Sequence, residues 1–168
     1  MDRTYRFLAL PLLFAASLAS PSYAATPLAA DRVMILKAQR TMVLYQNGQV
    51  LKSYKIALGP NAVGPKTRQG DRRTPEGNYT IDFRNSHSKF HLSLRISYPN
   101  DADRERARKL GVTPGGDIMI HGLPDGYSFL GPLHTRYDWT EGCIAVTNSE
   151  IEEIWHLVPI GTPVEIKP

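Results

Sequence analysis

The sequence predicts a single, mainly β domain that carries two short helices. Three observations indicate this class. Short apolar runs of strand length recur along the chain from Val33 onward, and several of them alternate apolar with polar residues. The pair Asn47-Gly48 lies between two such runs and is a strong hairpin signal, because a type I′ turn needs positive φ at both central residues. Only two segments show the spacing and end signals of helices.

The expected strands follow the apolar runs in chain order. Residues 92–98, for example, alternate apolar and polar side chains, which places the apolar ones on one face of a sheet. The full set is 33–36, 41–45, 50–51 with 54–58, 79–83, 92–98, 118–120, 143–146 and 163–166. Residues 60–75 are rich in Gly and Pro and are expected to form a loop.

The two expected helices have clear ends. Residues 101–110 are highly charged and are followed by Gly111, which is typical of a surface helix with a glycine stop. The second helix begins at Thr147, where Thr147 and Glu150 have the spacing of a capping box. Its apolar residues recur at helical spacing up to Pro159, so it is expected to dock on the sheet.

The composition is that of a packed globular protein. Of 168 residues, 42% are hydrophobic and 21% are charged, and this length fits one domain. The single cysteine excludes an intrachain disulfide and a thiolate zinc cluster within one chain. The net charge of +4 is too weakly basic to indicate a nucleic-acid partner.

The N-terminus has the pattern of a secretory signal peptide. Arg3 and Arg6 precede an apolar run over residues 7–19, and the small residues Ser22 and Ala24 follow it. The run is shorter than the roughly 20 residues that a membrane span needs. A buried N-terminal helix or an uncleaved anchor is the alternative.

Three segments follow from this pattern. We expect residues 1–24 to be a cleaved signal peptide, residues 25–31 a short linker and residues 32–168 the functional domain. Cleavage would leave no stable membrane span. The protein is therefore expected to be exported, to the periplasm or the cell envelope.

Cys143 and His121 are the residues around which a chemical site is expected. A thiol of ordinary pKa is mostly protonated at neutral pH, so a nucleophilic cysteine needs a base or a positive field beside it. His121 follows the expected strand 118–120 and titrates in the working pH range. The amides of Gly142 and Cys143 could point at a developing oxyanion.

These residues also have structural interpretations. A lone Cys143 between small and apolar neighbours is often a core residue, and a histidine such as His121 is often held by structural hydrogen bonds. His134, in the loop before the cysteine, is the rival base, but a strand end is the more rigid platform. His87 and His91 lie four residues apart without a nearby cysteine or carboxylate pair, so no metal site is expected.

Two separated motifs resemble the catalytic domain of L,D-transpeptidases of the YkuD (ErfK/YbiS/YcfS/YnhG) family. One is His121-Gly122 followed, after a long loop, by the sequence TEGCI over residues 140–144. The other is the upstream sequence GDRRTPEGNY over residues 70–79. The similarity extends over residues 33–166, and the segment around the cysteine is similar to that of YafK-type members.

The resemblance implies a β-sandwich-like fold and a cofactor-free enzyme that acts on peptidoglycan stem peptides. In such an enzyme Cys143 attacks a stem-peptide carbonyl and forms a thioester, and an amine then takes the acyl group. The amine belongs to another stem, to a wall-anchored lipoprotein or to a free D-amino acid. By the same resemblance His121 is the base, Gly142 belongs to the oxyanion region and Thr140 occupies the family's Ser/Thr position. With water as acceptor, the protein is instead a thiol hydrolase, either an L,D-carboxypeptidase or an amidase that releases wall-anchored protein.

Two positions depart from the family pattern. Glu141 stands where the family usually has His, and Ala145 stands where it usually has Arg. A carboxylate that pointed at the sulfur would disfavour the thiolate, so Glu141 is expected to face outward or to recognise an amine. Transfer to an amine and hydrolysis both stay open.

Four further residues are candidates for substrate binding. The cations Lys66, Arg95 and Arg136 suit the carboxylates of stem peptides, and Trp139 flanks the cysteine and could line a peptide groove. Each also fits a solvated loop face or ordinary aromatic packing. The alternative of another class is a non-catalytic peptidoglycan-binding module in which Cys143 is buried and inert.

Overall fold

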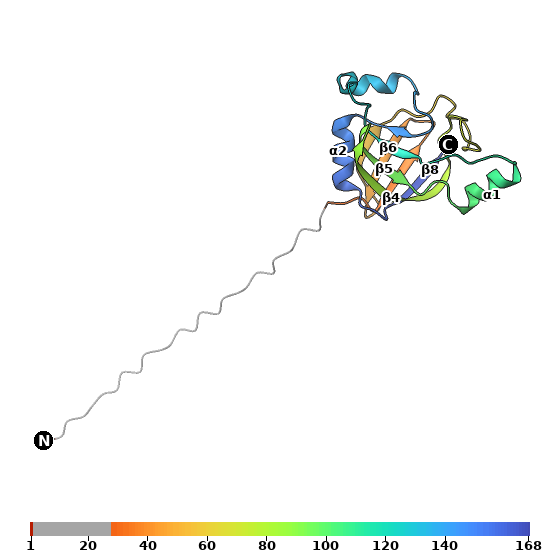
Figure 1. Cartoon of the computed structure of the whole chain (residues 1–168). Coiled ribbons are helices and arrows are strands. Elements are labelled where there is room, and N and C mark those ends of the chain that lie inside the picture. Colours follow the sequence, from red (N-terminus) through yellow and green to blue (C-terminus); the bar gives the residue numbers. More distant parts are fainter. Residues whose placement is uncertain (2–27) are drawn as a thin grey trace.

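The computed structural model describes Met1 and residues 28–168. Residues 28–168 form a strongly bent β-sheet with helices at its edges (Figure 1). Apart from Met1, the expected signal peptide lies outside the described residues. Ala30 is already buried, and its amide donates to the Leu157 carbonyl at 2.7 Å. No helix in the described part of the chain has the length and apolarity to cross a bilayer.

Eight strands and three short helices make up the domain. The strands are β1 Arg32–Leu36, β2 Thr41–Gln46, β3 Gln49–Lys55, β4 Gly77–Ser88, β5 His91–Ile96, β6 Met119–His121, β7 Ile144–Ala145 and β8 Pro163–Lys167. The helices are α1 Asp101–Lys109, the 3₁₀ helix η1 Ser128–Arg136 and α2 Asn148–Leu157. The strands form one sheet in the order β3-β2-β1-β8-β4-β5-β6-β7. The mainly β prediction is confirmed.

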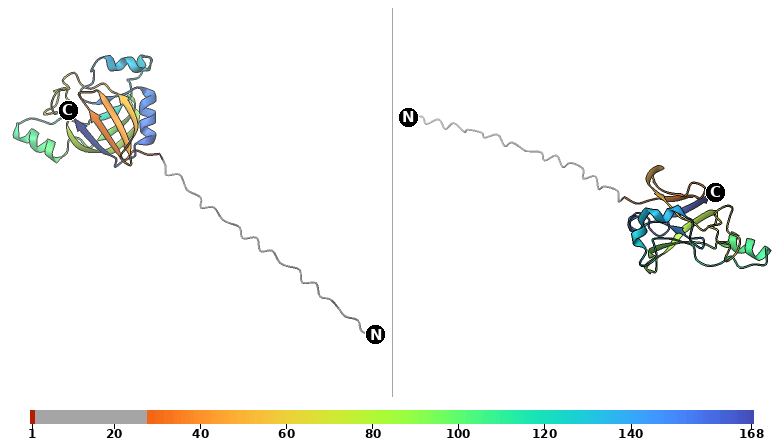
Figure 2. Two further views of the ribbon diagram at one scale, coloured as in Figure 1. Left: turned by 180° about the vertical axis from the view of Figure 1, so that it is seen from behind. Right: turned by 90° about the horizontal axis from the view of Figure 1, so that it is seen from above.

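The long strand β4 folds this sheet. Its residues 77–80 pair with β8, whereas the part from Ile81 onward pairs with β5. The register shifts between Ile81 and Phe83, and an irregularity of this kind bends a strand. The two halves of the sheet therefore face each other across one apolar core, which gives the sandwich-like shape seen in Figure 2. A bridge between Ala57 and Ala145 joins the two ends of the strand order.

The hairpin between β2 and β3 forms as predicted. Asn47 and Gly48 both have positive φ, at 51° and 77°, as a primed turn requires. Strand β3 ends at Lys55 rather than continuing to residue 58, because Ala57 pairs with Ala145 and no longer with the hairpin partner. The Ile56 amide donates to the Arg40 carbonyl at 3.0 Å, and Ala57 then pairs with β7.

Helix α2 packs against the strands next to the site, including β6, which ends at His121. Thr147 caps it through a capping box: the Glu150 amide donates to Thr147 Oγ1, and the Glu150 carboxylate accepts from the Thr147 amide at 2.8 Å. The helix buries Ile151 and Ile154 and packs against β5 and β6, beside the sheet in Figure 1. These features confirm the predicted helix.

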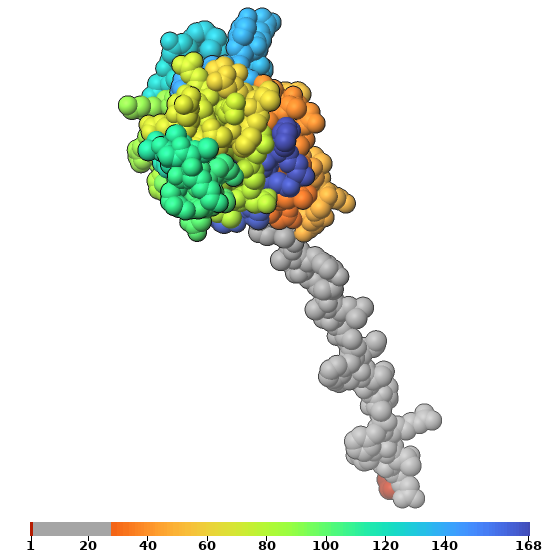
Figure 3. Space-filling view, turned by 90° about the vertical axis from the view of Figure 1, so that its right-hand side faces the viewer, coloured from red at the N-terminus to blue at the C-terminus, as the bar shows by residue number. Residues whose placement is uncertain are grey.

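The third helix, η1, was not expected from the sequence. Gly131 (φ 47°, ψ −134°) interrupts it and Pro132 follows, so the segment has no continuous helical periodicity to detect. It projects from the end of the sheet near α2, at the top of Figures 1 and 3, and it precedes the loop that leads to Cys143.

Candidate active site

His121 is the last residue of β6 and is held between two neighbouring strands. It lies opposite Ser93 of β5 and Ala145 of β7, and its side chain is buried. A Cβ at the following residue, Gly122, would lie 2.7 Å from Asn148 Oδ1 and 2.9 Å from the Phe90 carbonyl. Only glycine therefore allows the chain to pass so close to Asn148 and Phe90 directly after His121.

A single hydrogen bond sets the tautomer of His121. Nδ1 lies 2.7 Å from the Gly122 carbonyl oxygen, which only accepts, so Nδ1 carries the hydrogen. Nε2 is left as the lone-pair nitrogen, in the form that a general base needs. Burial lowers the pKa of His121 to about 4 against the smaller opposing effect of the Gly122 hydrogen bond, so the ring is neutral at neutral pH.

Cys143 is the residue immediately before β7, and its sulfur is partly buried. Sγ accepts a hydrogen bond from the Met119 amide at 3.4 Å. Burial raises the pKa of the thiol, while the Met119 hydrogen bond and the positive charge of Lys66 oppose that rise, and the charge of Asp117 adds to it. The resting thiol is therefore protonated at neutral pH.

The fold brings Cys143 and His121 to one cavity. Strands β6 and β7 are parallel neighbours in which His121 lies opposite Ala145, so Cys143 comes level with Met119, two residues before His121. Side chains two residues apart in a strand share a face, and this directs Cys143 and His121 to the same side of the sheet. Both side chains line a cavity of about 450 Å³, together with Phe90, Trp139 and Glu141. A neutral thiol and a neutral imidazole at one cavity fit proton transfer during attack rather than a preformed ion pair.

Thr140 and Gly142 build the turn that presents the sulfur. Thr140 Oγ1 donates to the Cys143 carbonyl at 2.7 Å and accepts from the Gly142 amide at 3.2 Å. Gly142 has φ of 120°, and a Cβ there would lie 2.5 Å from the Arg73 carbonyl oxygen. Thr74 Oγ1 in turn donates to the Gly142 carbonyl at 2.9 Å. The turn is thereby tied to the loop over residues 60–75.

This turn corrects the expectation for the Gly142 amide. Because that N–H is bonded to Thr140 Oγ1, it is not free to face an oxyanion. Among residues 28–168, no acceptor is bonded to the Cys143 amide, which is the remaining donor beside the sulfur. The contribution of Gly142 is the close approach of its backbone to the loop.

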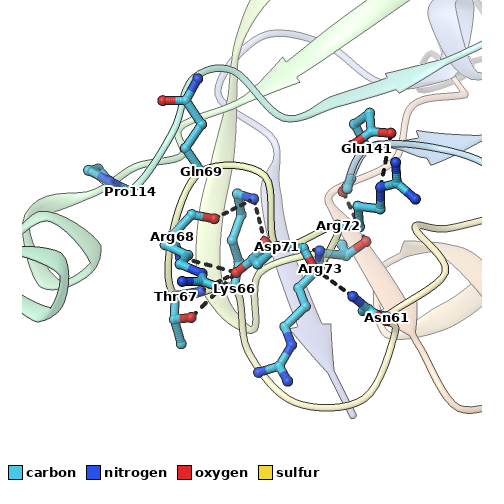
Figure 4. A network of polar contacts seen from close by, with 12 residues as sticks. Asn61, Lys66, Thr67, Arg68, Gln69, Asp71, Arg72, Arg73, Pro114 and Glu141 are labelled. Carbon is cyan, nitrogen blue, oxygen red and sulfur yellow. Dashed lines mark hydrogen bonds and ion pairs between the residues drawn. The ribbon is translucent and has the colours of Figure 1, made fainter. Parts of the chain in front are cut away.

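Lys66 has a different place from the one expected. Its side chain is buried, and Nζ donates to Asp71 Oδ1 at 2.7 Å and to the Arg68 carbonyl at 3.2 Å (Figure 4). Burial raises the pKa of Asp71, but the hydrogen bonds from Lys66 and from three backbone amides outweigh this and lower it to about 2. Lys66 thus holds the loop together and acts on Cys143 through its charge, rather than offering its ammonium to a substrate.

The other expected binding residues are dispersed. Arg95 pairs with Asp82 at 2.8 Å and with Asp117 at 3.5 Å, and it lines a cavity other than that of Cys143. Arg136 is exposed at a second cavity beyond Trp139. Trp139 alone of these borders the cysteine cavity.

Glu141 and His134 lie on different sides of the site. The side chain of Glu141 is 70% exposed and its carboxylate pairs with Arg72 at 3.3 Å, so it faces outward (Figure 4). His134 is buried at the second cavity and does not line that of Cys143, with its ring 6.4 Å from that of Trp139. The geometry therefore favours His121 over His134 as the partner of the thiol.

Two supporting ion pairs were missed by sequence reasoning. Arg40 donates to both carboxylate oxygens of Asp138, and Asp138 Oδ1 also accepts from the Leu58 amide at 3.0 Å, which anchors the start of the cysteine loop. Lys37 is only 1% exposed, and Nζ bonds Glu76 at 2.7 Å and two loop carbonyls. Their partners are 98 and 39 residues away, so no local pattern could reveal them. Among the described residues, no group of three His, Cys, Asp or Glu side chains could hold a metal ion.

Comparisons with known proteins agree with this geometry. A family model described as "L,D-transpeptidase catalytic domain" (YkuD) matches residues 30–166. The Escherichia coli K12 protein named "Putative L,D-transpeptidase YafK" is 35% identical over 133 residues, which are 75% of this chain and 46% of that protein.

Solved structures give the same result. A variant of the helical cell shape determining protein Pgp2 from Campylobacter jejuni superposes with a TM-score of 0.61 at 26% identity, over 82% of this chain and 47% of that one. Bd1075 from Bdellovibrio bacteriovorus gives 0.56 at 26% identity, over 83% and 48%. The chain thus spans about half the length of these relatives.

Proposed function

Because this chain belongs to the L,D-transpeptidase catalytic domain family, we propose that it is a cysteine acyltransferase acting on peptidoglycan stem peptides. The observation that carries the proposal is the convergence of Cys143 and His121 on one cavity, with His121 Nδ1 committed to the Gly122 carbonyl. The name of YafK, and the description of Pgp2 as a protein that determines cell shape, support the cell wall as the place of action. A site of action in the periplasm or cell envelope is part of the proposal.

The first half-reaction uses both neutral groups. His121 Nε2 takes the thiol proton as Sγ of Cys143 attacks the stem-peptide carbonyl carbon. The Cys143 amide donates to the oxygen that becomes negative. The carbon–nitrogen bond then breaks, the imidazolium returns its proton to the departing amine, and a thioester remains on the sulfur.

The second half-reaction reverses these roles. His121 removes a proton from an incoming amine, which attacks the thioester, and the sulfur leaves and regains a proton. Water in place of the amine gives a free carboxylate, which is the hydrolase alternative. Glu141 borders the cavity, and an incoming ammonium group can compete for its exposed carboxylate with Arg72, which lies 3.3 Å away; this observation supports an amine as the acceptor.

Muropeptide analysis tests the proposal. The purified domain, residues 25–168, is incubated with disaccharide tetrapeptides, and the products are separated and weighed by mass spectrometry beside a Cys143→Ala control. Cross-linked dimers or exchanged peptides identify a transferase, and shortened or released peptides identify a hydrolase. If the wild type and the Cys143→Ala variant give the same products, the proposal is wrong and a binding module is the better account.

A further inference from the structure

A second cavity lies beside the one that holds Cys143, and the proposed chemistry does not use it. It has a volume of about 450 Å³ and shares Trp139 with the cysteine cavity. Its walls come from η1 and the residues on either side of it. Most of the lining side chains are apolar or aromatic: Leu123, Pro124, Tyr127, Leu130, Leu133 and Tyr137.

His134 is a buried polar residue in the wall of this apolar cavity. The residue is only 5% exposed and lines the cavity, yet neither ring nitrogen has a hydrogen-bond partner within the described residues. The indole nitrogen of Trp139, on the wall shared with the cysteine cavity, is buried and unpartnered as well. A buried polar group without a partner costs about 1–3 kcal/mol, so these groups point to a ligand that brings both apolar surface and hydrogen-bonding groups.

The rim of the cavity adds an aromatic surface. The rings of Tyr127 and Phe129 are stacked, with centroids 6.3 Å apart and an interplanar angle of 24°. Phe129 is 78% exposed, and Tyr127 and Tyr137 are also exposed. Exposed aromatic rings grouped around a cavity mark a binding surface. They stand on η1 and its flanks, the segment that projects from the molecule in Figure 3.

An N-acetylated pyranose combines the properties that this surface selects. The apolar C–H face of the sugar ring stacks on an aromatic ring. The acetamido group carries a methyl for an apolar wall, a carbonyl that accepts and an N–H that donates. The acetamido carbonyl can accept from the Trp139 indole, and its N–H or a hydroxyl can bond His134, once these side chains turn to expose nitrogens that are enclosed in this structure. A stem peptide alone offers mainly carboxylates, amines and methyl groups, which do not need an apolar cavity of this volume.

The spacing of the two cavities fits one substrate. The ring centroid of Trp139 lies 5.8 Å from that of His121 and 6.4 Å from that of His134. Under the proposed function, the attacked carbonyl belongs to the third residue of a stem whose first residue is attached to the glycan. Three extended residues span about 10 Å. A sugar at the second cavity and a carbonyl at Cys143 can therefore belong to the same molecule.

We propose that the second cavity and the Tyr127–Phe129 surface bind an N-acetylated sugar of the glycan strand that carries the stem peptide. This inference rests on the proposed function and deepens it. The preferred substrate is then a glycan-linked stem rather than a free peptide, and the sugar site adds binding energy without touching the reacting atoms.

The test compares two substrates that differ only in the sugar. Acylation of Cys143 is measured with a disaccharide tetrapeptide and with the free tetrapeptide. In the wild type, KM for the sugar-bearing substrate is expected to be about tenfold lower. The Tyr127→Ala/Phe129→Ala double variant should lose this difference and keep the wild-type rate on the free peptide. Phe83→Ala, an exposed aromatic on β4, is the matched control and should retain the preference.

A binding measurement makes the inference independent of catalysis. The peptide-free disaccharide is titrated into the Cys143→Ala variant, and the indole N–H signals of Trp139 and Trp155 are followed by NMR. The Trp139 signal should shift, and the Trp155 signal should not. Equal KM values for the two substrates, a preference that survives the double variant, or an unmoved Trp139 signal would each overturn the sugar site. Failure of both substrates to acylate Cys143 would instead overturn the proposed function.

Discussion

The buried, neutral His121 leads to a specific pH dependence for acylation of Cys143. With its pKa lowered to about 4, about nine-tenths of the His121 rings are neutral at pH 5.0. An imidazole of ordinary pKa would be only about 3% neutral at that pH. Since only the neutral ring accepts the thiol proton, the two cases differ about 30-fold in rate at pH 5.0. The rate should therefore be nearly level from about pH 5 to pH 8.

The assay is single-turnover acylation at a saturating concentration of disaccharide tetrapeptide, quenched and weighed as intact protein. The His121→Gln variant is the control, because it lacks the base and should be slower by roughly 10²–10⁴-fold across the range. A wild-type rate that falls tenfold for each pH unit below 6.5 would show that His121 titrates as an exposed histidine. A rate that climbs tenfold per unit from pH 5 to pH 8 would show that a free thiolate of Cys143 attacks without a base.

Three substitutions test the supports of the site. Gly142→Ala should add about 1–3 kcal/mol of backbone strain and a clash with the Arg73 carbonyl, and it should slow acylation at least tenfold. Gly48→Ala is the control, because Gly48 has positive φ but open space around it, and it should leave acylation unchanged. Equal acylation rates in the two variants would show that the close approach at Gly142 does not matter. Lys37→Met removes a buried ion pair with Glu76 and should lower the free energy of unfolding in urea by about 3–5 kcal/mol. Lys52→Met removes an exposed ion pair and should lower it by less than about 1 kcal/mol. Similar losses in the two variants would contradict a stabilising role for the buried Lys37. Thr140→Val should slow acylation about tenfold by leaving the turn's amide and carbonyl unpaired, and Thr140→Ser should restore the rate; a failed rescue would argue against the hydroxyl.

Local signals in the sequence predicted the elements well. The Asn47-Gly48 turn and the capping box at Thr147 each depend on a few adjacent residues, and both form as predicted. The helix η1 was not predicted because Gly131 interrupts its periodicity. The end of β3 was predicted too late in the chain because residue 57 pairs with a strand far along the sequence. Pairing between segments far apart in the sequence cannot be predicted from local sequence patterns.

The same distinction applies to the site. The positions of His121 and Cys143 could be anticipated because His121 ends one apolar strand and Cys143 precedes another. The parallel pairing of β6 and β7 then places Cys143 level with Met119, on the face that His121 shares. Lys66 was expected to meet a substrate carboxylate, but the loop turns back and supplies Asp71 instead. The anchoring of Asp138 by Arg40 spans 98 residues and depends wholly on the folded sheet.

The most direct measurement of the central claim is the mass of the protein trapped during turnover with a tetrapeptide stem. The wild type should carry one thioester-linked acyl group that maps to Cys143 and is released by hydroxylamine. The Cys143→Ala variant should carry none, and the His121→Ala variant should accumulate it far more slowly. A wild-type protein that is folded, binds the stem and never gains the acyl mass would contradict the assignment of Cys143 as the nucleophile.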